Sequence, residues 1–161
     1  MAVHKLILDD FFEEASYTLI GIYCTVEDYR LAYLLNSYLK IHLKRKRTDL
    51  DFNNGKSTFS IFEWEDSKYL TTWNLVHNVS KVETYQKAEE QSLFDSEDKI
   101  TQTFYLIPEH KQVNYFLKID NEFDEEDEQD IIDTILKIPQ VSTAYKIDGN
   151  QLKSKNNLIF S

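Results

Sequence analysis

Three glutamates could form a cleft together with a histidine; they are Glu63, Glu65 and Glu109. Carboxylate and imidazole groups that lie together can exchange protons with a bound substrate. No two histidines are three or four residues apart, so their spacing gives no support for a metal site, although the fold could still gather them, and we expect surface or turn positions; they are His4, His42, His77 and His110. We expect no metal and no cofactor, and keep a small-ligand sensor or an enzyme with such a cleft as the alternative interpretation.

A basic run could contact nucleic acid; it comprises Lys44, Arg45, Lys46 and Arg47. Aromatic side chains on a neighbouring strand could stack on bases, as they do in proteins that bind single strands. The formal net charge of -10, however, repels a phosphate backbone. Because Glu63 and Glu65 are expected opposite the run, we expect cross-strand pairing, with RNA binding as a third interpretation.

Eight carboxylates occur in the eleven residues from Asp120 to Asp130, and such a dense acidic segment could bind calcium. An EF-hand loop needs Gly and a bidentate Glu where this chain has Glu125 and Ile131. Carboxylates in the first turn of a helix are stabilised by the helix dipole. We therefore expect these residues to begin a helix, with a weak divalent site as the minor alternative.

Cys24 is the only cysteine, which excludes an intramolecular disulfide and a zinc site built from several thiolates. Its place before a predicted helix N-terminus could lower the thiol pKa, but its apolar strand favours a buried, inert thiol. The chain contains only three glycines, Gly21, Gly55 and Gly149. Neither a P-loop nor a G-x-G-x-x-G turn can be built from them, which excludes nucleotide enzymes of those classes.

The chain of 161 residues is 42% hydrophobic and 14% aromatic, which predicts one globular domain with a packed core. Its start lacks the basic and apolar regions of a secretory signal. No apolar run approaches the roughly 18 residues that span a bilayer. We therefore expect a cytoplasmic protein that does not bind membranes.

Apolar periodicity predicts the elements that would position these side chains. They are strands over 3–8, 17–24 and 141–147, and helices over 26–39, capped by Thr25, and over 126–138, ended by Pro139. Asn54-Gly55 predicts a type I′ hairpin that sets Phe52 opposite Ser57 and Leu50 opposite Phe59. The same register continued outward gives four cross-strand pairs: Lys44 with Glu65, Lys46 with Glu63, Arg45 with Trp64 and Arg47 with Phe62.

Two more hairpins are expected further along the chain. A tight connection at Asp66-Ser67 would place Trp64 near Tyr69. The third hairpin joins strands over 101–107 and 113–119, because this register gives a ladder of aromatic pairs; they are Tyr105 with Tyr115 and Phe104 with Phe116.

Residues 80–100 form a polar stretch, and connections of this length tend to be functional or disordered. A short amphipathic helix through Val82, Tyr85 and residues 88–90 is one interpretation of it. The pattern as a whole predicts an α+β fold: a mainly antiparallel β-sheet of hairpins with two helices packed on one face. We expect a single domain over 1–148 that includes this insertion, followed by a C-terminal tail over 149–161.

The turn after Ile107 carries a motif, since Ile107-Pro108-Glu109 is followed three residues later by Val113-Asn114-Tyr115. This resembles the signature of the bacterial IPExxxVDY family, and the likeness extends to residues 8–11, 27–32 and 62–65. The family pattern has Asp where this chain has Asn114, so that position cannot form a carboxylate pair with Glu109. The resemblance implies a bacterial protein and brings no activity or catalytic residue with it.

Physically, the motif favours a hairpin shaped by Pro108, in which the Asn114 side chain bonds a backbone amide. The alternative is a recognition turn that presents Glu109 to a partner. Without a catalytic constellation, the sequence favours a non-catalytic binding or adaptor module for an unidentified protein, and an exposed edge strand would allow a homodimer. The residues expected to carry binding are the motif residues Pro108, Glu109 and Asn114 and the solvent-facing members of Trp64, Trp73, Tyr105 and Tyr115.

Overall fold

The computed structural model describes residues 17–52, 55–86, 98–121 and 123–160, so the strand expected over 3–8 lies outside the described residues. The α-helices of the described chain are α2 (Asp28–Leu39) and α3 (Glu125–Leu136), and its 3-10 helices are η1 (Pro108–His110), η2 (Gly149–Gln151) and η3 (Lys155–Leu158). The strands are β1 (Thr18–Cys24), β2 (Lys44–Arg45), β3 (Leu50–Phe52), β4 (Ser57–Phe59), β5 (Ile61–Asp66), β6 (Thr71–His77), β7 (Val79–Gln86), β8 (Asp98–Tyr105), β9 (Tyr115–Asp120) and β10 (Val141–Ile147).

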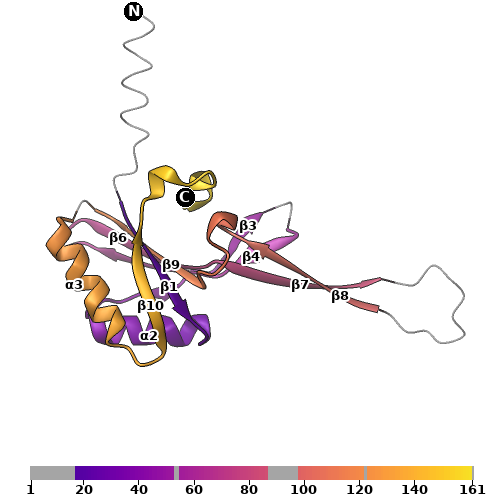
Figure 1. Ribbon diagram of the computed structural model, residues 1–161, viewed down its shortest axis with the longest axis horizontal. Coiled ribbons are helices and arrows are strands. Elements are labelled where there is room, and N and C mark those ends of the chain that lie inside the picture. The colour runs from indigo at the N-terminus through magenta and orange to yellow at the C-terminus, as the bar shows by residue number, and fades with distance from the viewer. Residues whose placement is uncertain (1–16, 53–54, 87–97, 122, 161) are drawn as a thin grey trace, which may run out of the picture.

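Six strands form one antiparallel sheet in the order β10-β1-β9-β6-β5-β2, and α2 and α3 lie on one face of it (Figure 1). This is the predicted α+β fold. Each helix joins two strands that run parallel but are not neighbours: α2 joins β1 to β2, with β9, β6 and β5 between them, and α3 joins β9 to β10, with β1 between them. The second of these, β9-α3-β10, is a split β-α-β unit.

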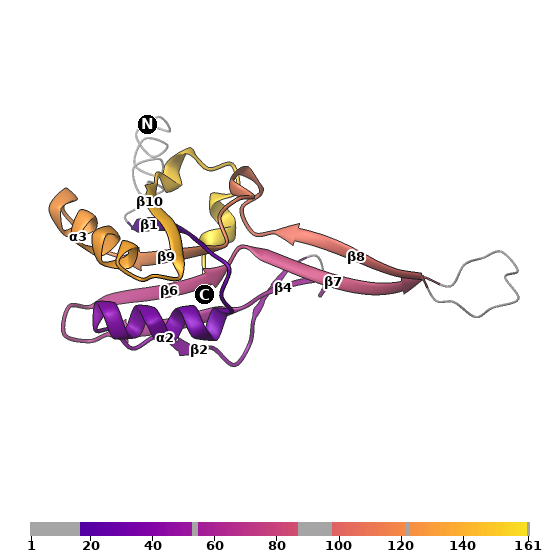
Figure 2. The same ribbon diagram turned by 60° about the horizontal axis from the view of Figure 1, so that its bottom comes forward.

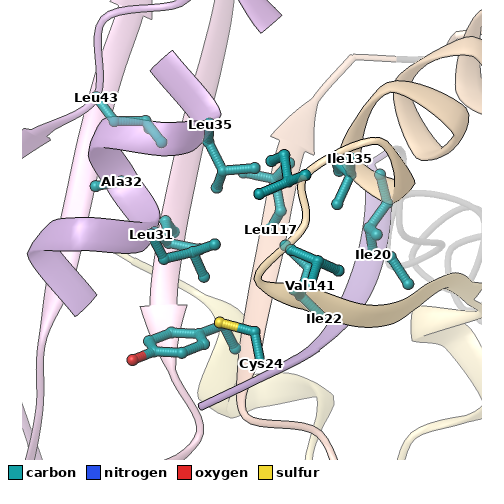
Figure 3. Close-up of a cluster of buried hydrophobic side chains, with 14 of the residues drawn as sticks. Ile20, Ile22, Cys24, Leu31, Ala32, Leu35, Leu43, Leu117, Ile135 and Val141 are labelled. Carbon is teal, nitrogen blue, oxygen red and sulfur yellow. The ribbon is translucent and has the colours of Figure 1, made fainter. Parts of the chain in front are cut away.

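The main core lies between the two helices and the sheet (Figure 3). The apolar periodicity over 26–39 predicts a buried stripe of four residues, Leu31, Leu34, Leu35 and Tyr38. Tyr38 is exposed and Leu34 is partly buried, but Leu31 and Leu35 are fully buried. Ile135 of α3 packs beside them against the central strands, where Ile20 and Leu117 are also fully buried. This packing fixes the sheet on which the candidate site is built.

A second core covers the opposite face of the sheet, and the C-terminal segment forms part of it. Leu152 and Leu158 are buried there, so residues 149–160 pack against the sheet. Lys118 is also buried, its ammonium donating to the Leu158 carbonyl oxygen at 2.8 Å and lying 5.0 Å from the Phe160 ring centroid. Gly21 makes this close packing feasible, because a Cβ there would lie 2.7 Å from the Ile147 side chain.

The helices begin close to their predicted positions, with different caps. Helix α2 begins at Asp28, and its cap is Glu27, not Thr25; the chain leaves the helix at Lys40, whose φ is +57°. In α3 the Asp124 carboxylate accepts a hydrogen bond from the Asp127 backbone amide at 2.8 Å. The acidic segment therefore caps and begins a helix, as the dipole argument predicted.

The register next to the Asn54-Gly55 turn is confirmed for two pairs, Phe52 with Ser57 and Leu50 with Phe59. Asn54 itself lies outside the described residues, while Gly55 has the positive φ of +82° that favours glycine. Further out, the predicted register is wrong by two residues, since Lys44 opposes Glu63 and Arg45 opposes Phe62. The cause is that β3 and β4 form a separate small sheet, and the chain bends before it joins the main one.

Two other predicted pairings are wrong. Trp64 lies opposite Trp73, not near Tyr69, because the β5–β6 connection is longer than Asp66-Ser67. The third hairpin does not form: β8 pairs with β7, whereas β9 lies between β1 and β6. Tyr105 therefore opposes Val79, and the Tyr105–Tyr115 and Phe104–Phe116 pairs are absent. The physical reason is the apolar character of β9 on both faces, which favours a central position in the sheet.

The described ends of the polar stretch, residues 80–86 and 98–100, belong to two paired antiparallel strands. Strands β7 and β8 pair along their whole length and extend away from the body as an arm (Figures 1 and 2). The helix proposed through Val82 and Tyr85 is therefore wrong, and residues 88–90 lie outside the described residues. Within the described ranges, no helix is long and apolar enough to cross a membrane.

Candidate functional site

The motif turn is held by a buried residue outside the motif, Asn78, between β6 and β7. Its side-chain amide donates to the carbonyl oxygens of His110 and Val113, both at 2.9 Å, and its Oδ1 accepts from the Ile107 amide at 2.8 Å. Ile107 and Val113 are fully buried, and Pro108 begins the 3-10 helix η1. The two ends of the turn are therefore anchored in the core, while Pro108, Glu109, Lys111 and Gln112 between them are exposed.

Glu109 holds the C-terminal segment. Its carboxylate accepts hydrogen bonds from the Ser154 hydroxyl at 2.6 Å and from the Ser154 backbone amide at 3.0 Å. Desolvation raises the pKa of Glu109, but these hydrogen bonds outweigh it and leave the pKa below its ordinary value. The carboxylate expected to face a partner is thus engaged within the chain.

Asn114 and Tyr115 connect the motif to the opening strand and to α2. Asn114 Oδ1 accepts from the Cys24 amide at 2.9 Å, which is the backbone bond predicted for this position. The Tyr115 hydroxyl donates to the Val26 carbonyl oxygen at 2.7 Å, and its ring stacks on His77 with centroids 4.6 Å apart. Burial raises the pKa of Tyr115, so the phenol stays protonated.

A hollow of about 500 Å³ lies beside the first turn of α2, at the root of the β7–β8 arm. We call it the arm-root hollow. Its polar lining includes three hydroxyl side chains, an amide, an imidazole, an ammonium and two carboxylates: Thr58, Ser60, Ser80, Asn114, His77, Lys81, Asp28 and Asp49. Ser60 and His77 lie opposite each other, since the His77 amide donates to the Ser60 carbonyl oxygen at 3.1 Å.

The described negative and positive side chains around the arm-root hollow are equal in number. The Arg45 guanidinium bonds Asp28 Oδ2 at 3.0 Å and also contacts the Asp49 carboxylate. Lys81 is exposed and forms no ion pair with any residue that the structure describes. Burial lowers the pKa of His77, although Asp28 opposes this, so the imidazole is neutral near pH 7.

Ser60, His77 and Asp28 are the side-chain types of a nucleophilic triad. Such a triad needs the hydroxyl hydrogen-bonded to the imidazole. Ser60 Oγ is buried and forms no hydrogen bond within the described ranges, and the Asp28 carboxylate is bound by Arg45 and by the Tyr29 amide. The hollow therefore offers hydrogen bonds to a ligand and lacks an activated nucleophile.

The predicted carboxylate–histidine cleft forms only in part. Glu63, Glu65 and His42 line a second hollow of about 510 Å³ together with Lys44 and Trp64. Glu109 is bound to Ser154 instead. Among the described residues, no three histidine, cysteine or carboxylate side chains are grouped to hold a metal ion.

The predicted aromatic surface is largely core. Trp73 and Tyr115 are only 7% and 2% exposed, because they face the helices. Trp64 is half-buried beside Trp73, and Tyr105 is half-buried with the Lys111 ammonium 5.5 Å from its ring centroid. Of the four predicted aromatic residues, only Trp64 and Tyr105 could contribute to a binding surface.

The basic run has partners, although not all of the expected ones. Arg45 pairs with Asp28 and Asp49 and lies 5.6 Å from the Phe62 ring centroid. Lys46 pairs with Glu63 at 3.4 Å, as expected, while Lys44 and Arg47 are exposed. Cys24 is buried, and burial raises its thiol pKa, as an inert thiol requires.

Sequence reasoning missed the residues that organise the site. Asn78 follows an apolar strand and looks like an ordinary turn residue, and Ser60 carries no local signal at all. The pairing of β5 with β6 aligns Ser60 with His77, and β6 with β9 aligns His77 with Tyr115. A correct prediction of the strand order would have placed Ser60, His77 and Tyr115 side by side.

Comparison of the chain with models of protein families, with curated proteins and with solved structures finds no match.

Proposed function

We propose that this protein is a non-catalytic protein-binding module and that the β7–β8 arm carries the binding. Phe104, near the base of β8, packs against the second core, and from there the arm extends away from the body (Figure 2). Its strands pair with each other over eight cross-strand positions, and β4 of the body contacts β7. A two-stranded hairpin is marginally stable in water, so a third strand or another partner surface would stabilise it.

The side chains of the arm support a polar, strand-adding contact. Lys81, Glu83 and Thr84 of β7 are exposed, and so are residues 99 and 101–103 of β8. The Lys99 ammonium pairs with Glu83 at 3.0 Å, so the arm's described charges partly cancel. Extended partners commonly bind such an edge through main-chain hydrogen bonds.

The residues of the Ile107–Tyr115 motif have structural roles, which argues against a catalytic role for the motif. Ile107, Glu109, Asn114 and Tyr115 each have an intramolecular structural contact. Membership of the IPExxxVDY family, a bacterial origin and a cytoplasmic location belong to this proposal; the motif, the single cysteine and the net charge of -10 support them.

The test compares the full chain with an arm-shortened chain in which Asn-Gly replaces residues 82–102, joining the opposed residues Lys81 and Thr103. Each tagged protein is crosslinked in a host lysate, and the crosslinked residues are located by mass spectrometry. We expect one dominant protein to crosslink to the arm of the full chain and to be lost from the shortened one.

A second variant serves as the control, with Tyr29→Ala and Tyr33→Ala on the exposed face of α2. It keeps the arm and should retain the partner. Retention of the same partner by the arm-shortened chain, or its loss from the α2 variant alone, would contradict the proposal. Sedimentation of the full chain distinguishes a second copy from a different protein.

A further inference from the structure

The arm-root hollow contains several polar groups that the fold itself leaves unused. The buried Ser60 hydroxyl has no hydrogen-bond partner in the described part of the chain. Buried polar groups are usually paired, and an exception needs an explanation. Ser60 lines the hollow, but its Oγ has almost no accessible surface, so a water or ligand in the hollow reaches this oxygen only after the side chain rotates toward it.

The neighbours of Ser60 offer further hydrogen bonds. Asn114 uses Oδ1 for the Cys24 amide, while its Nδ2 forms no hydrogen bond to any described residue. The neutral His77 imidazole supplies one donor and one acceptor. Ser80, which is only 7% exposed, also lines the cavity. These groups converge from β6, β7 and the segments that precede β5 and β9.

The charged side chains around the arm-root hollow favour neither an anionic nor a cationic ligand. The two carboxylates, Asp28 and Asp49, are offset by the Arg45 guanidinium that bridges them and by the Lys81 ammonium. An anion would meet two carboxylates, and a cation would meet Lys81 without a free acidic pair. Hydrogen-bonding capacity is what remains to recognise a ligand.

From this juxtaposition we infer that the arm-root hollow is a binding site for a small neutral polyhydroxylated molecule, such as a sugar or a cyclitol. The ligand hydroxyls would pair with Asn114 Nδ2 and a His77 ring nitrogen, and with Ser60 Oγ once that side chain rotates toward the hollow. A volume of about 500 Å³ is in the range of small-molecule sites. The inference does not rest on the proposed partner of the arm, although Ser80 and Lys81 of β7 line the hollow.

The test uses ¹⁵N-labelled full chain titrated separately with D-glucose, D-ribose and myo-inositol, each up to about 10 mM. Sodium phosphate and glycine are the charged and zwitterionic comparisons. We expect one neutral probe to give saturable shifts of the amides at residues 58, 60, 77, 80 and 114. Phosphate and glycine should leave these amides unshifted.

Three variants locate the contact. Ser60→Ala removes the orphan hydroxyl, and Asn114→Asp removes the amide donor while keeping the oxygen that accepts from Cys24. Loss of one neutral hydrogen bond should weaken binding about twofold to tenfold. Ser142→Ala, at an exposed position on β10 outside the hollow, should leave affinity unchanged.

Three results would overturn the inference. They are the absence of saturable shifts with every neutral probe, binding of phosphate or glycine alone, and unchanged affinity in both Ser60→Ala and Asn114→Asp. A matching amide spectrum of each variant outside the hollow shows that it has folded.

Discussion

Asn78 and Ile107 are joined by a 2.8 Å hydrogen bond from the Ile107 amide to the Asn78 side-chain oxygen, in a part of the core from which solvent is excluded. The same side chain also satisfies two carbonyl oxygens of the motif turn. One asparagine outside the motif therefore fixes the turn that the motif forms.

Replacing Asn78 by Leu is expected to lower the free energy of unfolding by about 3 kcal/mol, because a buried amide and two carbonyl groups lose their partner. Urea denaturation monitored by tryptophan fluorescence measures this. Gln112→Ala, at an exposed position in the same turn, should change stability by less than about 0.5 kcal/mol. Similar stability of the two variants would show that the turn does not depend on Asn78.

Lys118→Met should release the C-terminal segment. The substitution keeps an apolar stem but removes the ammonium that donates to Leu158 and lies near the Tyr17 and Phe160 rings. Hydrogen exchange of residues 152–160 should become faster while β1 and β9 remain protected. The control is Lys137→Met at an exposed position after α3. Unchanged exchange of the segment would contradict this role for Lys118.

Acid should loosen the same segment through Glu109. The folded-state pKa of Glu109 is lowered, so its stabilising effect is present above its ordinary pKa of 4.5 and is lost as pH falls through the folded value. The protection factors of residues 152–160, with the intrinsic exchange rate at each pH divided out, should therefore fall below pH 4.5 in the native chain, and Glu109→Gln should weaken this pH dependence. An identical pH profile in the variant would show that another carboxylate controls it.

His77 should make stability fall on mild acidification. Its folded-state pKa lies below the ordinary 6.5, so on acidification the unfolded chain takes up the proton first and stability decreases from pH 6.5 toward the folded value. His77→Phe keeps a ring against Tyr115 and removes the titrating group. Urea denaturation between about pH 7.5 and 5 should give a flatter profile for the variant, since the other histidines are common to both chains. A steeper or equal slope would contradict the assignment.

The parts of the fold with strong local periodicity were predictable. Helices α2 and α3 follow from apolar spacing, because each buries one stripe against the main core. Strands β1 and β10 follow from their apolar residues, which pack into both cores. The pairing of β9 was not predictable in this way. A turn motif between two β-rich segments favours a hairpin locally, but burial of β9 on both faces outweighs that preference.

The candidate site was less predictable, because it depends on strand order. Ser60, His77 and Tyr115 are far apart in sequence and align only when β5, β6 and β9 are neighbours. The motif residues themselves were interpreted correctly as structural where they bond backbone, as Asn114 does. Glu109 was expected to project, and its contact with Ser154 depends on the path of the C-terminal segment.

The two ends of the arm meet at one backbone hydrogen bond, from the Leu106 amide to the Asn78 carbonyl oxygen at 2.9 Å. A segment whose ends are adjacent can change length without moving the chain on either side of it. Adding or removing one opposed pair of residues at a time would preserve the alternation of faces. The arm is therefore a natural insertion point, where evolution or design can alter the reach of the molecule or graft another module onto an unchanged body.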